Sequence, residues 1–130
     1  MLSMVDPPKP GVKEAVQELK SAGIRAFMVT GDHPITATAI AKQVSILGTE
    51  PVEISTKDQI RGLIAGSSVM IHGDVVDELH SEDWKSLFSA SKEIVFARTL
   101  PRHKLIIVKE LQAQGEIVAV YYWLINTIGV

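Results

Sequence analysis

Apolar residues in this chain follow two patterns that alternate from one end to the other. Unbroken apolar runs are typical of buried strands, whereas apolar residues at every third or fourth position are typical of helices packed on one face. The mostly apolar runs are residues 24–29, 69–72, 93–97 and 117–120, in which Arg25, His72 and Glu93 are the polar exceptions, with a weaker strand candidate at 52–54. The helical spacing appears in residues 12–19, 34–44, 56–63, 82–90 and 101–114.

Strands that alternate with helices predict a parallel sheet, because parallel strands need long crossover connections that helices usually supply. We therefore expect a Rossmann-like α/β domain, a parallel sheet flanked by helices. The strands at 24–29, 93–97 and 117–120 should lie parallel, with Thr30, Arg98 and Val120 at one edge of the sheet.

Helix caps and inward-facing residues are also predicted. Ser55 or Thr56 should cap the helix at 56–63, and Ser81 the helix at 82–90. The inner face of the helix from Pro34 is predicted to consist of Ile35, Ala39, Ile40 and Val44. The inner face of the helix at 101–114 is predicted to consist of Leu105, Val108 and Leu111.

Composition narrows the function classes. The chain has 130 residues, 46% of them hydrophobic and 22% charged, which is typical of one soluble globular domain. Its net charge of −2 argues against nucleic-acid binding, and the absence of cysteine excludes disulfides and thiolate metal sites. The uncharged residues 117–130 would reach about 21 Å as a helix, too short for a hydrocarbon core of ~30 Å. No secretory signal is visible at the start of the sequence.

The join between the strand at 24–29 and the helix from Pro34 is the strongest candidate for chemistry. Thr30, Gly31 and Asp32 occupy it, so a hydroxyl, a close backbone approach and a charge meet at a helix N-terminus. A phosphoryl site is one interpretation. A tight strand-to-helix turn with Asp32 as the helix cap is the other, and the two are compatible.

Three segments resemble a known family. Residues 30–37 read Thr-Gly-Asp-His-Pro-Ile-Thr-Ala, residues 4–10 read Met-Val-Asp-Pro-Pro-Lys-Pro, and residues 96–105 read Phe-Ala-Arg-Thr-Leu-Pro-Arg-His-Lys-Leu. Together they resemble the phosphorylation domain of P-type cation-transporting ATPases, most closely the sodium/potassium and proton/potassium pump branch. The resemblance covers about residues 2–120 and implies the haloacid dehalogenase-like fold.

The resemblance also implies roles for particular residues. It assigns stabilisation of the transferred phosphoryl group to Lys104, Thr30, Gly31 and Asp32. It assigns nucleotide contacts to the same four residues together with Asp6 and Arg98. Without the resemblance, Lys104 would be interpreted as a solvated surface lysine. Lys9 stands where the family usually has arginine, so a bidentate contact there is in question.

Two family motifs are missing from the 130 residues. The aspartate nucleophile lies in an Asp-Lys-Thr-Gly-Thr string that does not occur here, and residues 121–130 diverge where the family has its magnesium carboxylate. We therefore expect a partial domain at 1–120, a divergent apolar tail at 121–130, and a sheet without its nucleophile strand. The resemblance implies that the missing strand lies between the strands at 24–29 and 117–120. These two strands should therefore either close together or keep unpaired inner edges.

The expected function is that of a partial phosphorylation domain from the cytoplasmic side of a pump that uses ATP and Mg²⁺. Alone it should be catalytically inactive, hold no tightly bound metal, and bind ATP or phosphate weakly; the remainder of a pump would be its partner. The alternatives are a noncatalytic regulatory module and a stand-alone phosphatase of the same superfamily. His33, His72, His80 and His103 are expected to be bystanders, and Gly73, Asp74, Asp77 and Glu78 to lead into a helix.

Overall fold

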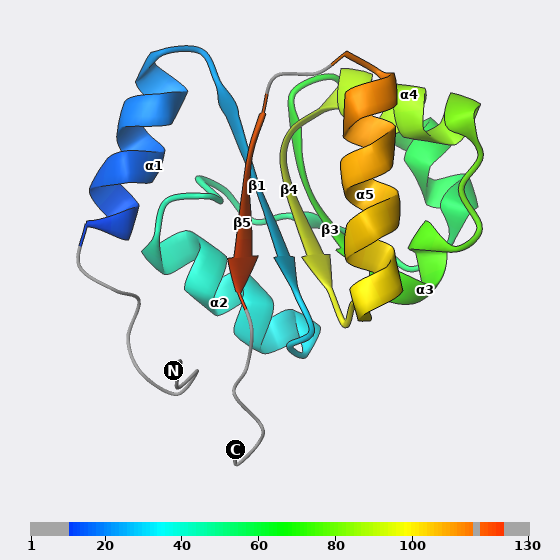
Figure 1. The fold of residues 1–130 in the computed structure, drawn as a ribbon, viewed down its shortest axis with the longest axis horizontal. Helices are drawn as coiled ribbons and strands as arrows, with labels where there is room; N and C mark the ends of the chain where they lie inside the picture. Colours follow the sequence, from blue (N-terminus) through cyan, green and yellow to red (C-terminus); the bar gives the residue numbers. More distant parts are fainter. Residues whose placement is uncertain (1–10, 116–117, 124–130) are drawn as a thin grey trace.

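The computed structural model describes residues 11–115 and 118–123, which form a parallel sheet with helices on both faces (Figure 1). The strands are β1 (Arg25–Thr30), β2 (Val52–Ile54), β3 (Ser67–His72), β4 (Ser91–Ala97) and β5 (Val118–Trp123). The helices are α1 (Val12–Ser21), α2 (Pro34–Gln43), the 3₁₀-helix η1 (Lys57–Gly62), α3 (Gly73–Val76), α4 (Ser81–Ala90) and α5 (Pro101–Ala113). The predicted α/β fold class is confirmed.

The strands lie in the order β2-β3-β4-β1-β5, and every pairing is parallel. Strand β1 lies between β4 and β5, where Phe27 is in register with Ile94 on one side and Val120 on the other. Of the two sequence-based alternatives, the first is therefore correct: the strands predicted to flank the missing one pair directly. Strand β5 also continues to Trp123, beyond the predicted end at residue 120.

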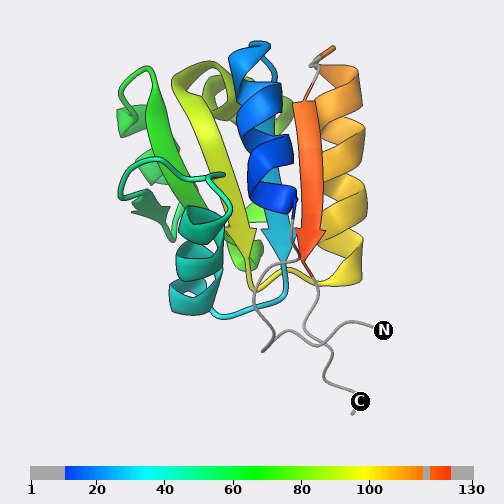
Figure 2. The same cartoon turned by 90° about the vertical axis from the view of Figure 1, so that its left-hand side faces the viewer.

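Each face of the sheet has its own hydrophobic core, because successive side chains of a strand point to opposite faces. Ala26 and Met28 of β1 join the cluster beneath α1 and α2, which Figure 2 shows in front of the strands. Phe27 and Val29 join the larger cluster on the other face, beneath α3, α4 and α5. The ring of Phe27 stacks on Phe88 of α4 with centroids 6.1 Å apart.

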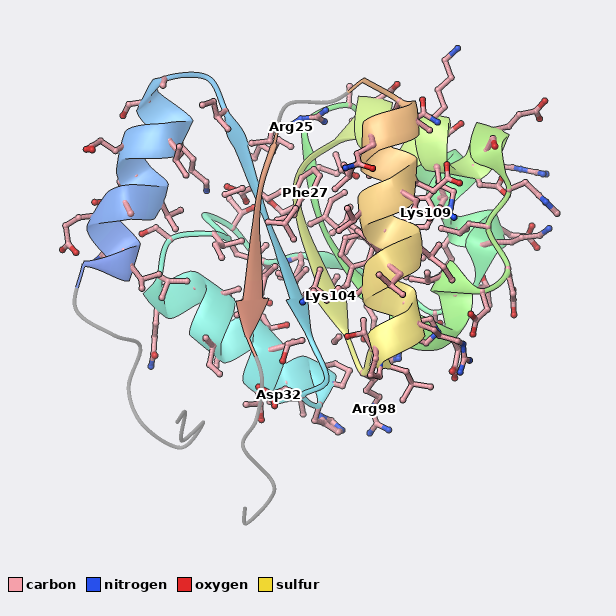
Figure 3. All side chains as sticks on the ribbon, viewed as in Figure 1. Arg25, Phe27, Asp32, Arg98, Lys104 and Lys109 are labelled. Atoms are coloured by element: carbon pink, nitrogen blue, oxygen red, sulfur yellow. The ribbon has the colours of Figure 1, made fainter. Side chains whose placement is uncertain are left out.

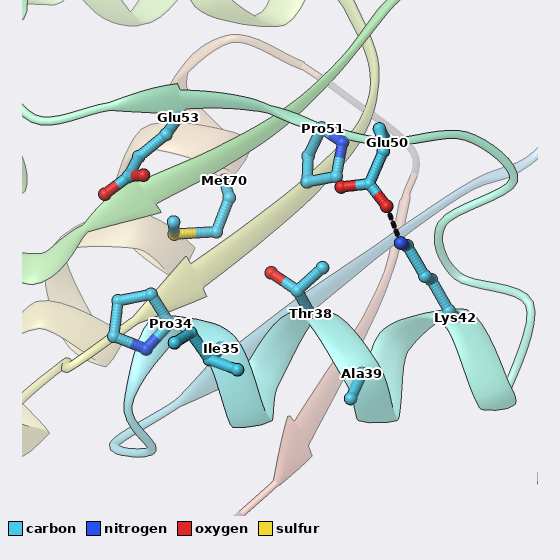
Figure 4. Close-up of a pocket in the computed structure, with 9 residues that line it drawn as sticks. All are labelled: Pro34, Ile35, Thr38, Ala39, Lys42, Glu50, Pro51, Glu53 and Met70. Carbon is cyan, nitrogen blue, oxygen red and sulfur yellow. Dashed lines mark ion pairs between the residues drawn. The ribbon is translucent and has the colours of Figure 1, made fainter.

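The inner face of α2 differs from the prediction. Ile40 and Val44 are buried as expected, but Ile35 is 76% exposed and Ala39 is also exposed. The buried residues are instead Pro34, Ala37, Ile40, Ala41 and Val44, and the last four belong to the cluster against the sheet. The small alanines allow a close approach of the helix to the sheet. Ile35 consequently borders a hollow of about 450 Å³ between α2 and β2 (Figure 4), which Ala39 and Met70 also line.

The inner face of α5 is likewise rotated from the prediction. Leu111 is buried and Val108 half-buried, but Leu105 is 66% exposed. The buried stripe consists of His103, Ile107 and Leu111, which lie at the i, i+4, i+8 spacing of one helix face. A histidine predicted to be a bystander therefore belongs to the core.

The structure defines the N-caps of η1 and α4. The segment predicted as a helix at 56–63 is a 3₁₀-helix, and Thr56 is its N-cap, as expected. Helix α4 includes Ser81, so the predicted Ser81 cap is wrong: His80 is the N-cap, and its backbone N–H donates to Asp83 Oδ2 at 3.0 Å. Carboxylates in the first turn of a helix favour this arrangement because they face its unpaired N–H groups.

Candidate functional site at the carboxyl edge of the sheet

The loops that follow β1 and β4 are joined at the carboxyl edge of the sheet. The backbone N–H and the hydroxyl of Thr99 both donate to the carbonyl oxygen of Thr30, at 3.0 and 2.9 Å. The Arg98 N–H donates to the carbonyl oxygen of Asp32 at 2.9 Å. These three hydrogen bonds connect two of the segments that the sequence singled out, about 70 residues apart.

The third loop at this edge follows β3 and contacts the β4 loop through Gly73. An added Cβ on Gly73 would lie 2.4 Å from the Arg98 carbonyl oxygen, a distance that real side chains do not reach. Gly31 is less restricted, since its Cβ would lie 3.3 Å from the Thr99 carbonyl oxygen. Arg98 itself has φ +54, a left-handed conformation that is uncommon for a residue with a side chain. Such backbone outliers concentrate at functional sites.

A hollow of about 350 Å³ opens where these three loops meet. It is lined by Gly31, His72, Gly73, Asp74, Arg98, Thr99, Leu100 and His103. Ligands of open parallel sheets bind beside the carboxyl ends of strands, which is where this hollow lies.

The predicted cations lie on two elements at this edge. Arg98 follows β4 directly and is exposed, while Lys104 lies in the first turn of α5 and is also exposed. Figure 3 shows Asp32 and Arg98 beyond the carboxyl ends of the strands, and in the same view Lys104 projects from α5 toward the sheet. Asp6, the sixth predicted site residue, lies outside the described residues.

Thr30 and Asp32 are both buried at the end of β1. The Thr30 hydroxyl accepts the Asp32 backbone N–H at 3.1 Å, which closes the turn. The N-cap of helix α2 is nevertheless His33, the residue after Asp32, because His33 Nδ1 accepts the Ile35 N–H at 3.3 Å. The interpretation of Asp32 as the helix cap is therefore wrong. The signal for His33 is its position directly before Pro34, because proline favours the first turn of a helix.

The Asp32 carboxylate is buried without hydrogen bonds. Only 1% of the residue is exposed, and neither carboxyl oxygen has a hydrogen-bond partner among the described residues. Burial raises the pKa of the Asp32 carboxyl above its ordinary value of 3.8, and the nearby Thr30 hydroxyl offsets part of the rise. An unpaired buried carboxylate destabilises the fold when it is ionised.

We expect Asp32→Asn to stabilise the chain at neutral pH, by an amount on the order of 1 kcal/mol, because it removes a buried charge without changing shape. The folded state holds the Asp32 proton to higher pH than the unfolded state does. The stability of the wild type should therefore fall as pH rises from 3.8 through the raised pKa. Urea unfolding of both proteins between pH 3.5 and 7 measures this. Equal stability of the two proteins at pH 7 would contradict the prediction.

Within the part of the chain that the structure describes, no three His, Cys, Asp or Glu side chains gather in a way that could hold a metal ion. The same residues include no helix that is long and apolar enough to cross a membrane.

Comparison with known proteins identifies what the chain is similar to. It is 45% identical over 127 residues to the sodium/potassium-transporting ATPase subunit alpha-A of Artemia franciscana, 48% over 128 residues to subunit alpha-3 of Gallus gallus, and 43% over 127 residues to subunit alpha-4 of Homo sapiens. Each match covers 92% of this chain but only 12–13% of the relative. The resemblance to the sodium/potassium pump branch is confirmed.

A family model matches a still larger part of the sequence. The model of the haloacid dehalogenase-like hydrolases matches residues 1–121. This range contains the whole candidate site, from the turn after β1 to the first turn of α5, and it agrees with the fold that the resemblance implied. The chain belongs to the haloacid dehalogenase-like hydrolase family.

Proposed function

We propose that this chain is part of the phosphorylation domain of a P-type cation-transporting ATPase, and that the carboxyl edge of its sheet, with the hollow that Gly31 and Arg98 line, is the phosphoryl-binding site. The observation that supports the proposal most is the set of hydrogen bonds between Thr30, Asp32 and the Arg98–Thr99 loop. They bring two segments predicted to contact the same phosphoryl group to one edge of the sheet. The similarity to sodium/potassium-transporting ATPase subunits supports the assignment to a pump.

Each residue has a role in this proposal. Lys104 and Arg98 supply positive charge, the Thr30 hydroxyl donates a hydrogen bond, and Gly31 permits a close approach of the backbone. Phosphoryl transfer depends mainly on positioning and on stabilisation of charge, so these groups suit it. Asp32 opposes an anion when it is ionised, and Asp6 would contact the ribose of the nucleotide.

The whole pump would use ATP and Mg²⁺, which this chain is not expected to use alone. The guanidinium of Arg98 lines the hollow and suits an anionic group. ATP should bind to these residues no tighter than about 1 mM, because only phosphate and ribose contacts are predicted for them. We place the domain on the cytoplasmic side of the membrane in the whole pump.

Phosphate titration tests the site. We expect inorganic phosphate without magnesium to shift the amide resonances of Thr30 and Gly31 in ¹⁵N-labelled chain, with a dissociation constant of about 1–10 mM. Lys104→Gln should weaken binding about threefold to tenfold, as expected for loss of one partly solvated charge. Magnesium should not strengthen it.

The matched control for the titration is Lys85→Gln, an exposed lysine in the middle of α4, the helix that leads into the opposite, amino-terminal end of β4. Its effect should stay within about twofold, since exposed charges more than a Debye length apart interact weakly. Thr30 and Gly31 amides that do not move, or that move only after magnesium is added, would contradict the proposed site. Hydrolysis of a chromogenic phosphate monoester would instead indicate the stand-alone phosphatase.

A further inference from the structure

His103 is a buried polar residue beside the proposed phosphate ligand Lys104. Only 1% of it is exposed, and its ring lines the hollow at the carboxyl edge. It is the third residue of α5, and the proposed function gives it no task. Both of its ring nitrogens nevertheless have hydrogen-bond partners from different parts of the chain.

The two hydrogen bonds define the protonation of the ring. Nδ1 lies 2.8 Å from the backbone nitrogen of Leu100, the N-cap of α5. A backbone N–H only donates, so Nδ1 is the acceptor. Nε2 lies 2.9 Å from Asp77 Oδ2 and therefore carries the hydrogen that the carboxylate accepts. The ring is neutral in this arrangement, because a proton on Nδ1 would break the bond to Leu100.

Asp77 connects the histidine to α3. It follows α3 directly, and its carboxylate also accepts from the exposed Arg102 at 2.9 Å. Hydrogen bonds from Arg102 and His103 lower the pKa of the Asp77 carboxyl below its ordinary value of 3.8. The carboxylate consequently remains ionised at any physiological pH, and it holds the ring in one tautomer.

The other end of α3 fixes the position of the same ring. A Cβ on Gly73 would lie 3.0 Å from His103 Nδ1, so the ring and the start of α3 are in close contact. Figure 1 shows α3 beside the first turn of α5, and the two helices are in contact. The start of α5 is thus attached to α3 through one side chain.

We propose that His103 is a positioning residue of the phosphate site, which fixes the first turn of α5, and with it Lys104, against α3. Its Nδ1 completes the N-cap of α5 as the third-residue side chain of a capping box does. Its Nε2 and Asp77 set the rotation of that turn. The relevance to anion binding rests on the proposed function, whereas the attachment of the helix does not.

Substitutions of His103 test both whether the side chain holds the first turn of α5 and whether that turn affects phosphate binding. In His103→Leu we expect the Leu100 amide to exchange with solvent at least tenfold faster, while the Leu111 amide near the other end of α5 is unchanged. Phosphate affinity should fall at least threefold. His103→Gln should restore both values to within about twofold, because a glutamine at the third helical position can accept the N-cap N–H and face Asp77.

Arg102→Gln is the matched control. It removes the exposed partner of Asp77 and leaves both bonds of His103, so the exchange of the Leu100 amide should stay as in the wild type. The wild-type ring also gives a direct readout: its ¹⁵N resonances should show a bare Nδ1 and a protonated Nε2. A protonated Nδ1 would overturn the positioning role even if His103→Leu does not fold.

The possible results distinguish this inference from the proposed function. A protonated Nδ1, or unchanged Leu100 exchange in His103→Leu, would overturn the positioning role. Equal phosphate affinity in His103→Leu and the wild type would also overturn it. A wild type that binds no phosphate would overturn the proposed site, while Leu100 exchange and the ring resonances still decide whether His103 holds the helix.

Discussion

Gly73→Ala is expected to lower the free energy of unfolding by about 2–3 kcal/mol, the range typical of overpacking at a rigid contact. The added Cβ would lie 2.4 Å from the Arg98 carbonyl oxygen and 3.0 Å from the Arg98 carbonyl carbon. Both atoms are backbone, so relief requires a shift of the loop after β4. The phosphate-induced shifts of Thr30 and Gly31 should weaken as well, since that loop is hydrogen-bonded to Thr30 and Asp32.

Gly62→Ala provides the control for this substitution. Nothing lies within 4 Å of a Cβ at Gly62, and its φ is not left-handed. Its stability should therefore stay within about 0.5 kcal/mol of the wild type. Urea unfolding compares the three proteins. If Gly73→Ala were as stable as Gly62→Ala, the close contact of the β3 and β4 loops would be refuted.

The fold was predictable because β1, β3 and β4 are buried on both faces along most of their length. Residues 26–29 of β1 are all buried, so this part of the strand appears in the sequence as an unbroken apolar run. Parallel pairing follows from the helices between the runs. The sequence did not determine whether β1 and β5 would pair. Pairing depends on which strands lie next to each other in the folded sheet, and the pattern of either strand alone does not show this.

The faces that helices α2 and α5 turn toward the sheet were less predictable. Helix α2 has alanine, isoleucine or threonine at most positions, so several faces look equally apolar. Helix α5 carries four consecutive apolar residues at 105–108, and any stripe through them fits a helical spacing. The inward turn of His103 depends on Asp77, 26 residues away, which no local pattern indicates.

The candidate site was only partly predictable. The turn at Thr30 and Gly31 is a local feature and was identified from the strand-to-helix join and the family motif. The contribution of Gly73 was missed, because a glycine after a strand is common and its close approach to Arg98 is a tertiary contact. The burial of the Asp32 carboxylate also depends on the packing around the turn.

Glu93→Ala is expected to lower the free energy of unfolding by about 2–4 kcal/mol, because it breaks a buried ion pair. Glu93 is only 5% exposed, and its carboxylate forms an ion pair with Lys20 of α1. It also accepts hydrogen bonds from Ser68 Oγ at 2.6 Å and from the Gly48 N–H at 3.0 Å. The substitution leaves three donors from different segments without this acceptor, and the partly exposed Lys20 moderates the loss.

The acid side of the stability profile provides the sharper test. Burial alone would raise the pKa of the Glu93 carboxyl, but hydrogen bonds from Lys20, Ser68 and Gly48 together lower it below its ordinary value of 4.5. The stabilisation is therefore complete above pH 4.5 and is lost as pH falls through the folded-state pKa. Glu93→Gln keeps the shape, so its stability should fall less steeply below pH 4.5 than that of the wild type.

Glu50→Ala is the matched control for Glu93. Glu50 forms an ion pair with Lys42 (Figure 4), and both side chains are exposed. Its loss should therefore change the unfolding free energy by no more than about 0.5 kcal/mol. Urea unfolding of the four proteins from pH 3 to 7 measures all of these effects. A Glu93→Ala protein as stable as Glu50→Ala at pH 7 would show that the buried network contributes nothing. Parallel acid profiles for the wild type and Glu93→Gln would show that the low pKa of Glu93 is wrong.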